Sequence, residues 1–277
     1  MNFICGDKFV AMSDFIYNIP HPDNYYNYPN TFSKKSIENF NGSPIIYALT
    51  GIAESLLSEL ANVNKNVVII THSADVPITQ ELCNKCPPNV IKWFSQNVSC
   101  NNPILHALPI GIENKHWFHM HNVHKEEQLE RKRKEKKRYI NLLYLNCSIQ
   151  TNKIERSACY QALIRNSWVT SVLHPNIFNF EEYIDNIHGH TFVACPSGNG
   201  IDTHRAWETL YLGCIPIERK NFNNKFWNDL PFCFINEWTD VTQKFLTSEN
   251  ERIINTKWNL DKLEFPYWES LIKSYTL

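Results

Sequence analysis

The sequence predicts an α/β protein of two domains, each built on its own parallel β-sheet. Short apolar runs typical of buried strands alternate with helical patterns in both halves of the chain. A highly charged segment separates the two halves, and 277 residues are enough for two domains of ordinary size. Alternating strands and helices favour parallel pairing through right-handed crossovers, so we expect two sheets facing across a cleft.

The first predicted domain covers residues 1–125. Its strand candidates are Ile45 to Leu49, Val67 to Ile70, Val90 to Phe94 and Ile104 to Ile110. Helical spacing of apolar residues from Ile52 to Leu60 predicts a helix between the first two strands. The second strand-like run, Val67 to Ile70, leads directly into Thr71-His72-Ser73-Ala74-Asp75. Functional side chains gather at the carboxyl ends of parallel strands, so His72 and Asp75 are candidates for chemistry.

The charged segment runs from Lys125 to Arg138 and holds eight basic residues and four glutamates. A solvated helix or a connector explains such a run, and a patch for an anionic surface is the alternative. We assign residues 126–138 to a connector between the domains.

The second predicted domain covers residues 139–277 and repeats the alternation. Its strand candidates are Ile140 to Asn146, Val169 to Leu173, Phe192 to Cys195, Cys214 to Ile217 and Phe232 to Ile235. Helices are expected at Asn152 to Leu163, Phe180 to Ile187, Val241 to Leu246 and from Trp258 onward. The last of these helices is expected to belong either here or to the first domain.

The most informative segment is Val193 to Glu218, which reads VACPSGNGIDTHRAWETLYLGCIPIE. A strand leads into the turn 196–200, a helix begins near Thr203 and ends at Gly213, and a second strand follows. This unit presents backbone N–H groups to a phosphate. The chain has only eight glycines, and three of them lie here. We expect them either at positive φ or beneath a closely approaching ligand.

The charges around this turn predict an anion site. Arg205 lies in the first turn of the expected helix, where a cation opposes the helix dipole unless an anion lies between them. Glu208 follows on the same face, as a partner for ribose hydroxyls or for Arg205 itself. Arg156 is a second candidate cation, with a solvated helix position as the alternative. The predicted donor-binding residues are Arg156, Gly198, Asn199, Gly200, Asp202, Thr203, His204, Arg205 and Glu208.

The run from Cys195 to Ile217 resembles the donor-sugar signature of exostosin-like glycosyltransferases. The likeness extends through the second half and, more loosely, to Thr71–Asp75 and to Leu108-Pro109-Ile110-Gly111-Ile112-Glu113. Within that family the chain is similar to small chlorovirus enzymes of capsid-glycan synthesis, one of them a xylosyltransferase. Animal members of the family carry a membrane anchor, and no stretch of this sequence has that character.

The resemblance implies a GT-B fold with two Rossmann-like domains, the N-terminal one for the acceptor and the C-terminal one for a nucleotide-sugar. It also implies inversion at the anomeric carbon and no required metal. The expected reaction moves a sugar, such as xylose, from a UDP-sugar to a glycan hydroxyl. Such a reaction needs a base, for which Asp75 is preferred, with His72 as its rival or partner. Asp14, expected on a helix, and Glu113 are weaker candidates.

Composition and residue spacing argue against several kinds of partner and site. A net charge of −1 argues against nucleic acid as a partner, and no apolar run is long enough to span a membrane. Nine cysteines without regular spacing fit a reduced, cytoplasmic protein, in the host cytoplasm if the protein is viral. The CxxC of Cys83 and Cys86 and the histidines 116, 119, 121 and 124 lack the spacing of a metal site. The remaining alternative is a binding module for nucleotides or glycans without catalysis.

Overall fold

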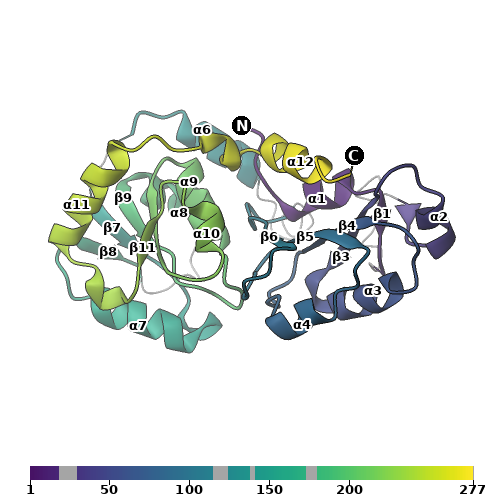
Figure 1. Cartoon of the computed structure of the whole chain (residues 1–277). Helices are drawn as coiled ribbons and strands as arrows, with labels where there is room; N and C mark the ends of the chain where they lie inside the picture. The colour runs from purple at the N-terminus through teal and green to yellow at the C-terminus, as the bar shows by residue number, and fades with distance from the viewer. Residues whose placement is uncertain (19–29, 115–123, 138–140, 173–179, 277) are drawn as a thin grey trace. The chain divides into compact units, whose positions relative to one another are not determined.

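A computed structural model describes residues 1–18, 30–114, 124–137, 141–172 and 180–276 of the chain (Figure 1). The chain divides into two compact units. The N-terminal unit comprises Asn2–Trp117 together with Glu264–Leu277, and the C-terminal unit comprises Met1 and Phe118–Leu263. The last helix, α12 (Phe265–Lys273), is therefore part of the N-terminal unit.

The N-terminal unit contains a six-stranded parallel sheet in the order β2-β1-β3-β4-β5-β6. Its strands are β1 (Phe15–Ile16), β2 (Asn30–Thr31), β3 (Ile45–Leu49), β4 (Val67–His72), β5 (Val90–Ser95) and β6 (Leu105–Ala107). The first two strands have only two residues each, which is why periodicity did not predict them. The expected strand from Ile104 to Ile110 is shorter than predicted.

Helices cover both faces of this sheet. Figure 1 shows α1 (Gly6–Met12) and α12 over one face, and α3 (Ala53–Leu60) and α4 (Gln80–Asn84) over the other. The short helices α2 (Lys34–Glu38) and η1 (Thr50–Ile52) complete the described elements of this unit. The central strand β4 is buried along its whole length, which matches the unbroken apolar run Val67 to Ile70 and also includes the polar residues Thr71 and His72.

The C-terminal unit contains a five-stranded parallel sheet in the order β11-β10-β9-β7-β8. Its strands are β7 (Asn141–Leu145), β8 (Val169–Ser171), β9 (His190–Ala194), β10 (Ile215–Arg219) and β11 (Cys233–Ile235). Its helices are α6 (Lys125–Arg133), η2 (Ile149–Thr151), α7 (Lys153–Leu163), α8 (Phe180–His188), α9 (His204–Tyr211), α10 (Asn224–Trp227), η4 (Trp238–Asp240), α11 (Gln243–Ile254) and η5 (Leu260–Leu263). Two parallel sheets with helices confirm the predicted α/β class.

The charged segment expected to act as a connector forms helix α6, which packs against α8 and α9 of the C-terminal unit. Leu129 is the buried residue of this helix. Its basic residues bind acidic neighbours on α8, as in the ion pair between Arg131 and Glu181. This arrangement agrees with the reading of the segment as a solvated helix.

Both sheets follow the same strand order. In each sheet, the strand that comes first in the chain lies between the second and the third, and the second forms one edge of the sheet. The order therefore reverses between β1 and β3 in one sheet, and between β7 and β9 in the other. Open α/β sheets bind ligands beyond the carboxyl ends of the strands at such a reversal. Topology thus directs attention to the loops that follow β7 and β9.

Candidate anion site at the strand-order reversal

The glycine turn predicted from the sequence lies at the strand-order reversal of the C-terminal unit. Strand β9 ends at Ala194, the turn follows, and α9 begins at His204. Strand β7 ends at Leu145 and leads through Ser148 into α7. The carboxyl ends of β7 and β9 are neighbours in the sheet, so these two loops approach the same edge.

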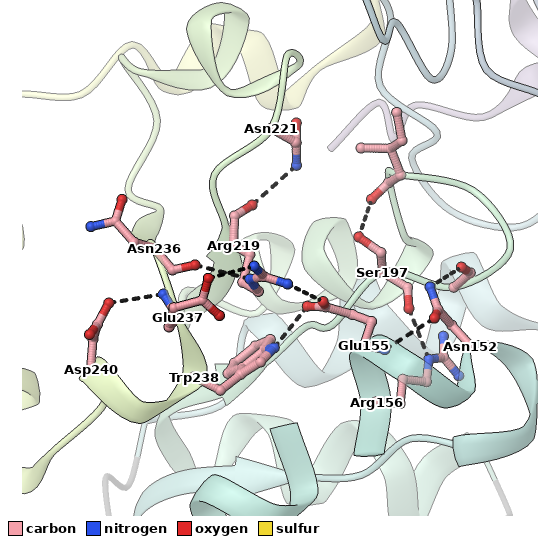
Figure 2. Close-up of polar contacts among 12 residues, drawn as sticks. Asn152, Glu155, Arg156, Ser197, Arg219, Asn221, Asn236, Glu237, Trp238 and Asp240 are labelled. Atoms are coloured by element: carbon pink, nitrogen blue, oxygen red, sulfur yellow. Dashed lines mark hydrogen bonds and ion pairs between the residues drawn. The ribbon is translucent and has the colours of Figure 1, made fainter. Parts of the chain in front are cut away.

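Helix α7 holds the glycine turn through two side chains of its first turn and a half (Figure 2). The amide of Asn152, the N-cap of α7, donates to the carbonyl of Gly198 at 3.0 Å. Arg156 donates from Nε to the carbonyl of Ser197 at 3.1 Å and from Nη1 to that of Ser148 at 2.8 Å. One guanidinium therefore ties together the loops that follow β7 and β9.

Gly198 lies closely against the guanidinium of Arg156. A Cβ atom at this position would lie 2.9 Å from Nη2 of Arg156, closer than such atoms come in real structures. Of the glycines in this segment, Gly213 has a positive φ, 67°, just after α9, as expected of a helix C-terminus. The sequence analysis expected these glycines either at positive φ or beneath a closely approaching ligand. At Gly198 there is a close approach, but the approaching group is a side chain of the protein.

Arg156 is buried, with 8% of its surface exposed, and keeps donors for a ligand. Its Nε and Nη1 are engaged, whereas Nη2 makes no hydrogen bond within the described residues. Burial lowers the pKa of Arg156 below its ordinary value, and the charge of Arg205 lowers it further. Since a guanidinium stays protonated in proteins, two positive charges are held close together at this edge.

Arg205 is the second cation, and in the described part of the chain it makes no hydrogen bond or ion pair. Its Nε is inaccessible to solvent and has no partner. Its guanidinium lies over the ring of Tyr183 at 5.7 Å, and the charge of the nearby Glu208 carboxylate favours its charged form. The expected alternative, a pair with Glu208, does not form, because that carboxylate accepts a 2.8 Å hydrogen bond from the hydroxyl of Tyr183.

A second polar atom without a partner lies at the start of α9. Thr203 is the N-cap of this helix, yet its side chain makes no capping hydrogen bond, and its Oγ1 is buried and unpaired. Buried donors and acceptors without partners cost about 1–3 kcal/mol each. Thr203 and Arg205 thus mark a place where a polar ligand would supply missing interactions.

The backbone contributes less to this site than the sequence predicted. The N–H of Gly198 donates to the carbonyl of Gly200 at 3.1 Å, and the N–H of Thr203 donates to the carboxylate of Asp202 at 2.9 Å. These two N–H groups are engaged within the turn itself. Asn199 is exposed at its tip, and His204 is half-buried at the start of α9.

Two acidic residues of the predicted donor site have structural partners. Asp202 accepts from the indole N–H of Trp207 at 2.9 Å, and this indole packs edge-on against Trp227. Glu208 is buried beneath Tyr183. Both carboxylates are therefore engaged by residues beneath the turn. This leaves Arg156 and Arg205 as the cations of the predicted site that are available to an anion.

The network in Figure 2 extends from α7 to the carboxyl end of β10. Glu155 accepts from Arg219 at 2.8 Å through one oxygen and from the indole of Trp238 at 2.8 Å through the other. Arg219 also pairs with Glu237 at 2.8 Å. These bonds fix the first turn of α7, which carries Asn152 and Arg156, against the end of β10.

A buried acid that the sequence analysis did not single out lies on β10. Glu218 is 5% exposed, and its Oε1 has no hydrogen-bond partner. Burial, and then the charge of Asp202, raise the pKa of Glu218 well above its ordinary value. Asn223, in the next loop, is also buried with both amide atoms unpaired. Unpaired polar atoms therefore extend along this edge beyond the predicted residues.

In the N-terminal unit, the two candidate bases differ in their surroundings. His72 is 1% exposed at the end of β4, and its Nε2 lies 3.1 Å from the carbonyl of Pro109. Asp75 is exposed three residues later. Asp14 follows α1 at a bend, not on a helix as expected, and its carboxylate accepts from the N–H of Ile45 at 2.8 Å. Glu113 is half-buried.

The CxxC cysteines and His124, which the sequence analysis considered as metal ligands, lie within the described residues. Cys83 pairs with Cys100, with 3.3 Å between the sulfur atoms, rather than with Cys86 of its CxxC. Among the described residues there is no group of three or more His, Cys, Asp or Glu arranged to hold a metal ion. His124 is exposed before α6, and the other three histidines of its cluster lie outside the described residues.

The sequence analysis missed Tyr183, Ser73 and Glu218. Tyr183 lies on α8, twenty-two residues before Arg205, and no local pattern connects the two. Ser73 lies inside the segment singled out at the end of β4. Its backbone has φ of 58°, a left-handed conformation that is uncommon outside glycine and that the sequence pattern did not predict. Glu218 directly follows the predicted strand Cys214 to Ile217 and belongs to β10, which extends to Arg219.

In the described part of the chain, no helix is both long and apolar enough to cross a membrane. Comparison with models of known protein families gives no match, and comparison with curated proteins gives no significant match.

Proposed function

We propose that the chain is an inverting glycosyltransferase of the GT-B type that uses a UDP-sugar as donor. In this proposal the C-terminal unit binds the nucleotide-sugar, the N-terminal unit binds a glycan acceptor, and xylose is the transferred sugar. The resemblance of Cys195–Ile217 to the exostosin-like donor signature supports it. The observation that carries it is the pair of cations, Arg156 and Arg205, at the strand-order reversal.

The two guanidiniums suit a diphosphate better than a single carboxylate. The charge of Arg205 lowers the pKa of Arg156, and within the described residues neither guanidinium forms an ion pair with a carboxylate, although the charge of Glu208 acts on Arg205. Two like charges in a partly dry site repel each other unless an anion lies between them. Charge-assisted hydrogen bonds from guanidiniums to phosphate oxygens are among the strongest in proteins. A doubly charged ligand would relieve the repulsion and fill the unpaired donors.

The same geometry supports group transfer. When the bond from the anomeric carbon to the diphosphate breaks, negative charge grows on the leaving oxygen. Arg156 is held in place by two loop carbonyls, so its Nη2 is aimed before the reaction begins, and preorganised donors of this kind stabilise transition states most. These cations would meet the charge of the leaving group from protein side chains, without requiring a metal.

The acceptor hydroxyl must lose its proton as it attacks the anomeric carbon. Asp75 and His72, on or just after β4 in the N-terminal unit, are the candidates carried from the sequence. Neither is part of the donor site, so donor binding and acceptor activation are separable by mutation.

The test is a panel of UDP- and GDP-sugars, with UDP and GDP, screened for thermal stabilisation, slow donor hydrolysis and transfer to glycan acceptors. We expect UDP and one UDP-sugar to raise the melting temperature, and that sugar to be hydrolysed slowly and transferred to an acceptor. Arg156→Ala should lose the stabilisation by UDP, and Arg165→Ala, which changes an exposed arginine just after α7, is its control.

Two results would replace the proposal. Binding of a nucleotide or a glycan without hydrolysis or transfer would favour a non-catalytic binding module of the same fold. Binding of DNA or RNA that falls steeply with salt, and that is lost when the basic residues of α6 are changed, would favour a nucleic-acid protein.

A further inference from the structure

Ser73 has an unusual backbone conformation at the carboxyl end of β4. Its φ is 58°, although serine is not among the residues most often found in the left-handed region. Residues held in sparsely populated conformations persist when the surrounding structure determines them, and they cluster at functional sites. The N–H of Ser73 donates to Oε1 of Gln96 at 3.1 Å, and Gln96 is itself 1% exposed. A buried side chain thus holds the strained residue in place.

Three side chains converge on the hydroxyl of Ser73. Tyr47 donates its hydroxyl at 3.0 Å, Asn114 donates its amide at 3.4 Å, and Nδ1 of His72 lies at 3.2 Å. The backbone of Gly6 also approaches closely, because a Cβ there would lie 2.4 Å from this oxygen. A hydrogen bond between His72 and the carbonyl of Pro109 also joins the two segments of the first half that resemble the family, 71–75 and 108–113.

The direction of the Ser73–His72 hydrogen bond follows from the other side of the imidazole. The carbonyl of Pro109 can only accept, so Nε2 of His72, 3.1 Å away, carries a proton. In the neutral imidazole Nδ1 is then an acceptor. Since Tyr47 and Asn114 both donate to the hydroxyl of Ser73, that hydroxyl gives its own proton to Nδ1.

His72 and Ser73 differ in their accessibility to a substrate. His72 is buried and has both ring nitrogens engaged, so an acceptor hydroxyl has no free nitrogen to reach. Ser73 is exposed. Of the donors to its oxygen, Asn114 makes the longest bond, at an exposed position, and is the one that an incoming hydroxyl would replace.

We propose that Ser73 and His72 form a proton relay that activates a hydroxyl of a glycan acceptor bound at this edge of the sheet. The inference rests on the proposed glycosyl transfer. The acceptor oxygen forms its bond to the anomeric carbon, and the diphosphate leaves with the electron pair of the broken bond. The acceptor proton passes to the oxygen of Ser73 while the proton of Ser73 passes to Nδ1 of His72. The resulting imidazolium later releases its proton to water. Ser73 contacts the substrate, and His72 acts through it.

The test compares Ser73→Gly with Asn18→Gly in the full-length protein. Glycine accepts a positive φ without strain, which offsets part of the cost of leaving Tyr47 and His72 without the hydroxyl. Asn18 is exposed in the same unit with φ of 47° and controls for the glycine itself. We expect Ser73→Gly to remain folded and to keep its stabilisation by UDP, and to lose transfer at least about 100-fold, the usual contribution of a general base. Asn18→Gly should match the wild type in all three.

A second measurement distinguishes a relay from structural support. The turnover rate in mixtures of H2O and D2O should curve for the wild type, because two protons move together, and should become linear in His72→Gln, whose amide can still donate to the Pro109 carbonyl. A Ser73→Gly variant with unchanged turnover, or a linear dependence in the wild type, would overturn the relay. Loss of activity in Asp75→Asn beside an active Ser73→Gly would assign the base to Asp75.

Failure of the relay differs from failure of the proposed function. If the wild type is stabilised by UDP and transfers sugar while Ser73→Gly is fully active, only the relay is wrong. If the wild type neither binds a UDP-sugar nor transfers sugar, the proposed function is wrong and the relay falls with it.

Discussion

Arg156 donates to the carbonyl of Ser197 at 3.1 Å, and these two residues lie on α7 and on the loop after β9. The same guanidinium binds the carbonyl of Ser148 on the loop after β7. A single buried cation thus spans the strand-order reversal and keeps Nη2 for another partner. Because the two bonds restrict the side chain, little further entropy would be lost when that nitrogen binds a ligand.

Replacing Arg205 should separate binding from stability. In Arg205→Met the melting temperature of the ligand-free protein should change little, because no described hydrogen bond or ion pair is lost, and removal of a desolvated charge offsets the lost attraction to Glu208. The same variant should lose stabilisation by UDP. Thermal unfolding with and without UDP measures both effects, and Arg165→Met is the control. A large drop in melting temperature without ligand would show that Arg205 stabilises the fold.

Gly198→Ala should weaken donor binding through Arg156. The new methyl group would lie 2.9 Å from Nη2, so the guanidinium or the turn must shift. We expect the dissociation constant for UDP to rise about tenfold, which corresponds to about 1.4 kcal/mol. Gly51→Ala is the matched control, because a Cβ at that glycine meets no atom within 4 Å. Calorimetric titration with UDP compares the two, and equal affinities would show that Nη2 does not contact the nucleotide.

Glu218 should make the stability depend on pH. Its pKa is raised in the folded protein, so the folded state holds a proton that the unfolded chain releases near its ordinary value of 4.5. Stability is therefore highest below that value and is lost as the pH rises toward the raised pKa. Glu218→Gln, which mimics the protonated acid, should melt above the wild type at pH 8 and close to it at pH 4. Glu251→Gln, at an exposed position on α11, should show no such difference.

The cysteines of the CxxC should be unreactive in the folded protein. Burial raises the pKa of Cys83 to about 12, assisted by Cys100, and burial raises that of Cys86 to about 11. Since the thiolate is the reactive form, alkylation at pH 7.5 should be slow at both residues and become fast in denaturant. Mass spectrometry after a short exposure to iodoacetamide measures this. Rapid labelling of Cys86 in the folded protein would contradict the burial seen here.

Periodicity was enough to predict the elements with long, unbroken patterns. Strands β3, β4 and β5, helix α7 and the strand–turn–helix unit from β9 to β10 fall where the sequence predicts them. Strands β1 and β2 were missed because two-residue strands carry no period. A helix was expected at Asp14, but α1 ends at Met12 and Asp14 follows it. The placement of α12 depends on contacts with α1, which are distant in sequence.

The sequence by itself determined the α/β class, the glycine turn at 196–200 between a strand and a helix, and the position of Arg205 in that helix, because these depend on local pattern and on the end of one strand. Only the tertiary structure decided what each side chain meets. In it Arg156 binds loop carbonyls, Glu208 binds Tyr183 and Asp202 binds Trp207, while Nε of Arg205 has no hydrogen-bond partner among the described residues. Hydrogen bonds between residues twenty or more positions apart are set by the crossing of strands and helices, and no spacing along the chain records them.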